Sequence, residues 1–235
     1  MKRPMGLHKI AACSIVAIAL AVWSYAWLHD TGYKPAEPAD DQVGMTPLSN
    51  TRSGGWVYGS RGARFTVIEY GDLECPYCKD YFPHLKAWLD QHPDVNLQWH
   101  HLPLSMHEPV AGYEARWAEC AGIEGGNKAF WMALEIIYQR TRSNGLGVAV
   151  NPQVPGLEDR QNAIDECAAN DISVQRTVRS QAHQASLEGV TATPTLVVKD
   201  NLTARSIKLE GAPDGDLLLS AIDWLARTDA RDGHK

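Results

Sequence analysis

The pattern of hydrophobic and polar residues divides the chain into an apolar N-terminal run, a polar segment and a long region of short periodic stretches. The apolar run extends from Ile10 to Leu28 without a charged residue, and Lys2, Arg3 and Lys9 precede it. A helix of this length reaches about 28 Å, roughly the thickness of the hydrocarbon core of a bilayer. We expect residues 1–28 to form an uncleaved signal anchor in the inner membrane, with the N-terminus in the cytoplasm and the rest of the chain in the periplasm or another extracytoplasmic space.

Two alternatives to this transmembrane anchor stay open. Ala19-Leu20-Ala21 has the small-x-small pattern of a cleavage site, so a signal peptide that is removed is the first alternative. Trp23, Tyr25 and Trp27 follow this site closely, and such aromatic rings favour the membrane interface, which argues for retention. A buried core helix is the second alternative, and the basic flank and terminal position argue against it.

Residues 29–55 are rich in Pro, Gly, Asp, Ser and Thr and have no apolar period of helical or strand type. This composition is typical of a flexible linker. We therefore expect a tether between the anchor and a folded domain over residues 56–228, followed by a short C-terminal tail at 229–235.

The periodic region alternates between strand-like and helix-like segments. Arg64 to Tyr70 (RFTVIEY) and Val95 to Leu102 (VNLQWHHL) are rich in β-branched and aromatic residues, which predicts strands. Further strands are expected at Thr195 to Lys199 and Ala204 to Leu209. Helices are predicted at residues 76–90, 109–122, 128–140, 158–189 with a division near Asn170, and 212–227.

The predicted order is therefore strand, helix, strand, a block of helices, strand, strand and helix. Without the block, at about residues 108–189, this is a small α/β domain whose sheet has helices on both faces. The connectivity rules are satisfied if the first two strands are parallel and the last two form a hairpin. The fold class is thus an α/β core with one helical insertion.

Charge and cysteine content narrow the function classes. The chain has 235 residues and a formal net charge of −6, which argues against a nucleic-acid-binding protein because such proteins are usually basic. Of the five cysteines, Cys13 lies in the predicted anchor. The other four, Cys75, Cys78, Cys120 and Cys167, are the even number that paired cysteines in an exported domain give.

Cys75 and Cys78 lie in the segment EYGDLECPYCK, between a predicted strand and a predicted helix. A structural zinc site needs four ligands, and the other cysteines are single and distant. His100 and His101 are adjacent on a predicted strand and face opposite ways, so they cannot both complete such a site; we expect them and His107 to be packing or surface residues. A structural disulfide at this spacing restricts the unfolded chain little.

Electron transfer suits the pair better than a metal or a structural disulfide. Pro76 fits the first position of a helix, whose free N–H groups and partial positive charge stabilise a thiolate at Cys75. Cys78 lies one turn further along the same face, where its thiol can donate to the Cys75 sulfur. Cys75 is therefore the expected nucleophile and Cys78 the resolving cysteine.

The segments VIEYGDLECPYCKDYFPHLKAWL and GVTATPTLVV, with helices between them, resemble the DsbA-like thiol-disulfide oxidoreductases of the thioredoxin superfamily. The resemblance covers roughly residues 57–227. It implies a thioredoxin core with an inserted helical subdomain, which agrees with the interrupted order above. It also implies an enzyme without an organic cofactor or a metal.

The resemblance assigns roles to further residues. Thr193 and Pro194 match the family's cis-proline loop, which offers backbone groups to an extended peptide. By their position in the motif, Pro76 and Tyr77 are expected to contact the same substrate; the alternative for Tyr77 is a solvated ring. Glu69, six residues before Cys75, matches a buried acid that assists proton transfer to or from Cys78. The alternative for Glu69 is an ordinary strand carboxylate at the edge of the protein.

Cys120 and Cys167 both fall in the predicted helical block, and we predict a disulfide between them, as in several family members. Closing a loop of nearly fifty residues contributes ~4 kcal/mol in the chain-entropy model. The alternative is two buried free thiols that pack as small apolar residues.

The expected function is oxidation of exported proteins that carry cysteine thiols, followed by reoxidation of the enzyme by a membrane quinone reductase of the DsbB type. Pro-Tyr between the cysteines also occurs in isomerase-like relatives and glutaredoxins. A disulfide isomerase or reductase kept reduced by a membrane donor is therefore the nearest alternative. A non-catalytic chaperone or metal carrier with the thioredoxin shape is an alternative of another class.

Overall fold

The structure, a computed structural model, describes residues 55–150 and 152–232, with side chains described as far as Arg227. The predicted anchor at 1–28 and the predicted tether before Gly55 lie outside the described residues. Within the described ranges, no helix is both long enough and apolar enough to cross a membrane.

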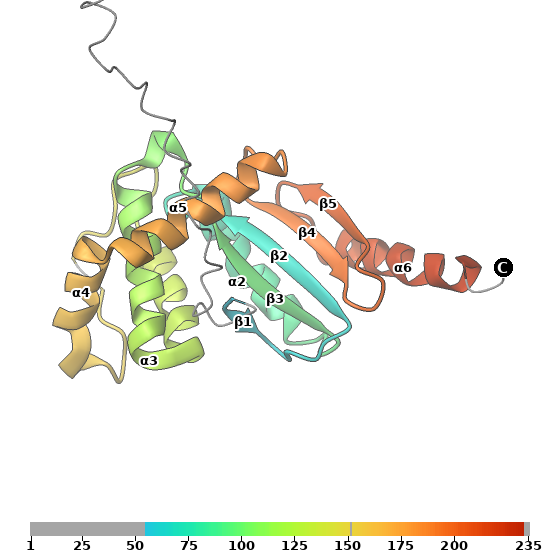
Figure 1. Cartoon of the computed structure of the whole chain (residues 1–235), viewed down its shortest axis with the longest axis horizontal. Helices are drawn as coiled ribbons and strands as arrows, with labels where there is room; N and C mark the ends of the chain where they lie inside the picture. Colours follow the sequence, from blue (N-terminus) through green and yellow to red (C-terminus); the bar gives the residue numbers. More distant parts are fainter. Residues whose placement is uncertain (1–54, 151, 233–235) are drawn as a thin grey trace, which may run out of the picture. The chain divides into compact units, whose positions relative to one another are not determined.

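A five-stranded mixed sheet forms the centre of the domain (Figure 1), in the order β1-β3-β2-β4-β5. β2 (Phe65–Gly71) runs parallel to β3 (Val95–His101) and antiparallel to β4 (Thr195–Asp200). β4 and β5 (Ser206–Glu210) form an antiparallel hairpin. The parallel first pair and the final hairpin both match the sequence prediction.

β1 and the starts of β5 and α6 differ from the prediction, each for a local reason. β1 (Val57–Tyr58), which pairs antiparallel with β3, was not predicted because two residues are too few to form a period. β5 starts two residues late because Ala204 has a φ of 59°, which is left-handed and not extended backbone. α6 (Gly215–Asp232) starts after Asp214, whose Oδ1 accepts a 2.8 Å hydrogen bond from the Leu217 N–H and so caps the helix.

Helices cover both faces of the sheet. In Figure 1, α5 (Ile172–Leu187) passes in front of β2 and β3, and α2 (Pro76–Leu89) lies behind them. Alternate residues of a strand face opposite sides. Phe65 and Val67 therefore join the main core with α2, and Tyr70 joins a smaller cluster with residues of α5. Glu69 shares the face of Phe65 and Val67, the side that α2 covers.

The helical insertion lies between β3 and β4. It contains α3 (Val110–Arg140), α4 (Gln161–Asn170) and α5, together with the short 3₁₀ segments η1 (Ser105–His107) and η2 (Glu158–Arg160). α3 is broken at Gly126, whose φ of 78° interrupts the helical backbone. This break corresponds to the gap between the helices predicted at 109–122 and 128–140.

A chain of polar contacts joins the insertion to the sheet. Trp99 Nε1 donates to His101 Nδ1 at 2.9 Å, and His101 Nε2 lies 3.4 Å from Glu119 Oε1 on α3. The other Glu119 oxygen accepts a 2.8 Å hydrogen bond from Trp56 Nε1. His101 is 1% exposed, so this histidine is a packing residue of the interior.

Candidate active site

Cys75 occupies the N-cap position of α2, and Pro76 follows in the first turn of that helix. The proline stabilises this start because its missing N–H would have no intrahelical partner there. Cys75 and Cys78 are both free thiols and both buried. Tyr77, between them, is 72% exposed, so the motif presents one aromatic side chain to solvent.

The pKa values of the two thiols are shifted in opposite directions. A hydrogen bond from Cys78 is the largest influence on Cys75 and lowers its pKa to about 6; the Thr193 hydroxyl and the Tyr77 and Cys78 amides act in the same direction, while burial opposes them. Burial raises the pKa of Cys78 well above its usual value, and donation to Cys75 raises it further. The arrangement therefore holds one thiolate and one thiol at neutral pH.

The loop before β4 lies against Cys75. The Thr193–Pro194 peptide bond is cis, and Cys75 Sγ lies 3.4 Å from the Thr193 carbonyl oxygen. Thr195 Oγ1 donates to the Ala192 carbonyl at 2.7 Å and closes the loop. The Thr193 hydroxyl is buried beside the Cys75 sulfur.

Glu69 is fully buried on the central strand β2, in register with Trp99 on β3 and Leu196 on β4. It is therefore not a carboxylate at the edge of the protein. Neither carboxyl oxygen has a hydrogen-bond partner among the described residues. Burial, with a smaller contribution from the Cys75 charge, raises the pKa of Glu69 to about 8, so this carboxyl is protonated at neutral pH.

The turn before Cys75 is held by residues that the sequence did not single out. Asp72 accepts hydrogen bonds from the Glu74 amide at 2.7 Å and the Leu104 amide at 2.8 Å, and His107 Nδ1 lies 2.7 Å from it. Tyr138 on α3 donates to the Asp72 carbonyl at 3.2 Å. Asp72 adjoins the motif in sequence, but the residues that contact it come from distant segments and carry no spacing signal.

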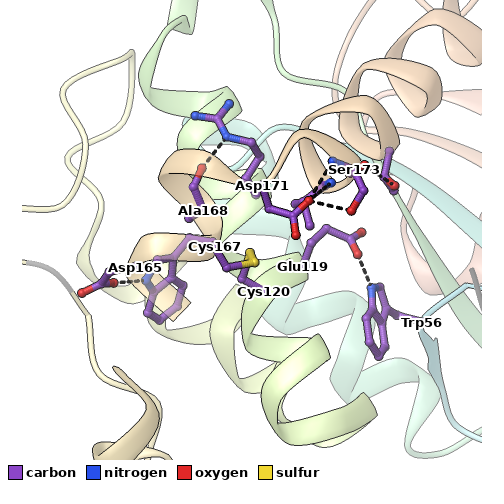
Figure 2. The surroundings of a disulfide bond; sticks show 12 residues. Trp56, Glu119, Cys120, Asp165, Cys167, Ala168, Asp171 and Ser173 are labelled. Carbon is purple, nitrogen blue, oxygen red and sulfur yellow. Dashed lines mark hydrogen bonds between the residues drawn. A yellow bond between two sulfur atoms is a disulfide. The ribbon is translucent and has the colours of Figure 1, made fainter. Parts of the chain in front are cut away.

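Cys120 and Cys167 form a disulfide between α3 and α4 (Figure 2). Their Cα atoms are 6.0 Å apart. Neighbouring contacts reinforce the same junction: Trp117 Nε1 donates to Asp165 at 2.8 Å, and Arg116 Nε donates to the Ala168 carbonyl at 2.7 Å. This bridge is a structural element of the insertion. In the described part of the chain, no group of three His, Cys, Asp or Glu side chains is arranged to hold a metal ion.

Comparison with known proteins identifies relatives that share the fold and the thiol chemistry. The family model described as Thioredoxin matches residues 51–213. DsbA2 of Pseudomonas aeruginosa is 49% identical with a TM-score of 0.69, over 73% of this chain and 94% of that one. Alpha-DsbA1 of Wolbachia pipientis, at 19% identity and a TM-score of 0.60 over 77% and 94% of the two chains, shares the fold.

A curated relative of another kind is the Na(+)/H(+) antiporter NhaA 1 of Salinispora arenicola, 31% identical over 170 residues. The match covers 71% of this chain but only 24% of the antiporter, so the chain spans about a quarter of that protein's length.

The fold, the Thioredoxin family model and the similarity to DsbA2 define an enzyme of thiol-disulfide exchange. The chain belongs to the thioredoxin family and, within it, to the DsbA-like protein thiol-disulfide oxidoreductases.

Proposed function

We propose that this oxidoreductase acts as an extracytoplasmic oxidase, with Cys75 as the nucleophile and Cys78 as the resolving cysteine. The main support is that the pKa values of the two thiols are shifted in opposite directions: the pKa of Cys75 is lowered to about 6, and the pKa of Cys78 is raised. Because a thiol of lower pKa leaves faster, this asymmetry makes Cys75 the sulfur that leaves when the second substrate thiol resolves the mixed disulfide. The position of Cys75 against the Thr193 loop supports it as the sulfur that the substrate attacks first.

The reaction begins with the Cys75–Cys78 disulfide. A substrate thiolate attacks Cys75 Sγ, the bond between the two enzyme sulfurs breaks, and Cys78 leaves with the electron pair. Protonated Glu69 supplies the proton that converts Cys78 to a thiol. The second substrate thiol then releases its proton to solvent and attacks the substrate sulfur of the mixed disulfide, and Glu69 regains a proton from solvent. Cys75 leaves as a thiolate, so two electrons reach the enzyme and the substrate gains one disulfide.

Substrate binding is assigned to the residues around the sulfur. The cis Thr193–Pro194 segment lies against Cys75 and provides backbone groups beside the reacting atom. Exposed Tyr77 offers an aromatic surface next to the motif, and Pro76 shapes the turn that presents it. An extended peptide placed along this loop would bring its own cysteine towards Cys75.

The lowered pKa of Cys75 can be converted into a contribution to the reduction potential of the pair. At pH 7, a thiol pKa of about 6 instead of 9.0 stabilises the reduced form by about 1.4 kcal/mol, or ~30 mV. That is a small part of the ~150 mV between thioredoxin and a strong oxidant such as DsbA. The direction therefore depends on the measured potential of the pair.

Equilibration of the domain with glutathione buffers, read by thiol trapping, tests the oxidase proposal. We expect a reduction potential above about −180 mV and oxidation of a dithiol peptide at pH 7. Cys75→Ser is expected to abolish turnover, and Cys78→Ala to trap a mixed disulfide through Cys75. A potential near −270 mV, with the dithiol form predominating in cells, would instead establish a reductase or isomerase. Full activity of Cys75→Ser would point to a chaperone-like role.

The cellular setting completes the proposal. Residues 1–28 anchor the enzyme in the inner membrane, and residues 29–55 tether the catalytic domain on the periplasmic side. Its substrates are exported proteins with free cysteines, and a DsbB-type membrane protein reoxidises Cys75 and Cys78. A disulfide between Cys120 and Cys167 fits an oxidising compartment.

A further inference from the structure

Glu74, the residue immediately before Cys75, is fully buried and bound to the loop at residues 141–147. Thr141 Oγ1 donates a short hydrogen bond to Glu74 Oε1, and the Gly147 amide donates to Oε2 at 2.9 Å. The Glu74 carbonyl accepts a 2.8 Å hydrogen bond from the Asn144 amide. Both the side chain and the backbone of Glu74 therefore join the Cys75 turn to this loop.

A second glutamate reaches the same place from α3. Glu114 is 3% exposed, and neither of its oxygens has a well-formed hydrogen bond among the described residues. A Cβ atom added at Gly147 would lie 3.9 Å from Glu114 Oε1, so the carboxyl group lies beside the residue whose amide binds Glu74. Two buried carboxylates in this position would repel each other strongly, whereas one shared proton turns the repulsion into a hydrogen bond.

We propose that Glu114 is a positioning residue for the Cys75 turn: it stays protonated at neutral pH and donates to Glu74, so that the pair holds the turn against loop 141–147. The proposal rests on the role of Cys75 proposed above. It assigns Glu114 no contact with the reacting sulfur.

The donors decide which glutamate carries the proton. Glu74 receives hydrogen bonds on both oxygens, which favours its carboxylate form, while the nearby Val148 amide is the donor that acts on Glu114. Burial is the largest cause that raises the pKa of Glu114 to about 9; the Glu74 charge adds to it, and the nearby Val148 amide acts in the opposite direction.

Other charged groups surround the pair without replacing this proton. Asp72 adds negative charge, and it is already bound to His107. Lys79 on α2 donates to the Thr141 carbonyl at 2.6 Å instead of to either glutamate. Arg142 donates to carbonyl groups within its own loop.

The proton makes the stability of the fold depend on pH in a defined window. The pKa of Glu114 rises from 4.5 to about 9 on folding, so between these values the folded chain holds a proton that the unfolded chain releases. The stability that Glu114 contributes is complete below the lower value and falls as the pH rises to about 9. Above that value both carboxyl groups are charged, and the contact between the turn and the loop weakens.

Glu114→Gln tests the proposal because an amide can donate to Glu74 at every pH. The reduced domains of wild type and variant are unfolded by denaturant between pH 5 and 10, without any substrate. We expect the folding equilibrium constant of the wild type to fall relative to that of the variant by about tenfold per pH unit up to pH ~9, and then to level off. Glu119→Gln is the matched control, since Glu119 is a buried glutamate on the same helix that accepts a hydrogen bond from Trp56.

Alkylation of Cys75 against pH provides the readout of positioning. Once Cys75 is fully ionised, the wild-type rate is expected to rise again by about threefold near pH 9 as the turn loosens locally, whereas Glu114→Gln stays on its plateau. Parallel stability curves, or the same second rise in both proteins, would overturn the proposal.

A second measurement covers a variant that fails to fold. Carboxyl carbon NMR of wild type labelled at glutamate follows Glu114 directly: a titration near pH 9 supports the proposal, and one near pH 4.5 overturns it. None of these measurements uses the reduction potential. A reduction potential typical of a reductase would reject the oxidase proposal but not the proposal for Glu114. An ionised Glu114 would reject the proposal for Glu114 but not the oxidase proposal.

Discussion

Cys75 and Cys78 are both buried, yet their thiol pKa values move in opposite directions because their partners differ. Cys75 receives hydrogen bonds from the Cys78 thiol and from the amides at the start of α2, and these outweigh its burial. Cys78 lies deeper and close to Glu69, so each charge around it makes ionisation harder. Most of the difference between the two pKa values arises within the CPYC motif, so the roles of Cys75 as nucleophile and Cys78 as resolving cysteine could be predicted from the sequence.

Glu69 gives a prediction at this scale. If Glu69 supplies the proton to Cys78, Glu69→Gln is expected to slow formation of the mixed disulfide by about tenfold to a hundredfold at pH 7, since general acid catalysis is lost. The wild-type rate is expected to fall above pH 8 as Glu69 ionises, and the variant to lack this inflection. Stopped-flow tryptophan fluorescence with a dithiol peptide provides the profile, and an unchanged rate would refute the role.

The same carboxyl group affects folding. Its pKa is about 8 in the folded chain and 4.5 when exposed, so its contribution to stability is complete below pH 4.5 and is lost as the pH rises towards 8. The expected slope is about 1.4 kcal/mol per pH unit in this window. Denaturant unfolding of reduced Glu69→Gln is expected to show a weaker dependence of the free energy of unfolding on pH than the wild type. An equal pH dependence in the two proteins would contradict a protonated, buried Glu69.

Among the elements, the longest helix combines two functions. The N-terminal half of α3 carries Glu114 towards the Cys75 turn, and Cys120 near the break at Gly126 joins α4. The sequence predicted two helices, at residues 109–122 and 128–140, and these correspond to the two parts of α3 on either side of Gly126. It did not predict which polar residue of α3 would meet Glu74, because that contact depends on how the whole insertion folds back on the core.

The bridge between α3 and α4 gives a prediction at this scale. Cys120→Ala with Cys167→Ala is expected to lower the free energy of unfolding by up to ~4 kcal/mol, because the unfolded chain loses a cross-link that closes a loop of 47 residues. Denaturant unfolding of the double variant measures this loss. The pKa of Cys75 is expected to stay unchanged, since the bridge does not contact it. A loss below about 1 kcal/mol would mean that the Trp117 and Arg116 contacts hold the junction alone.

At the scale of the whole molecule, the order of strands and helices followed from periodicity, and the supports of the site did not. β2 and β3 are mostly buried on both faces and are rich in β-branched and aromatic residues, which predict strands well. Thr141 and Gly147 lie in an irregular loop more than 60 residues after Glu74, with which they form hydrogen bonds, so no local pattern relates them. Tertiary structure alone brings these groups together.

The proposed anchor is tested on the full chain. We expect the full chain to sediment with the inner membrane and a chain starting at residue 29 behind a cleavable export signal to be released in soluble form from the periplasm. Recovery of the full chain in the soluble periplasmic fraction, shortened at its N-terminus, would favour the signal peptide instead.

The outer strands of the sheet are built in a way that limits further pairing. β1 has two residues, and β5 directs Ser206, Lys208 and Glu210 outward, with Lys208 Nζ 3.8 Å from Glu210. A short or charged border offers little template for another extended chain. The exported proteins proposed as substrates can therefore react at Cys75 without pairing as an extra strand of the sheet, so the reaction does not expose an edge on which chains aggregate.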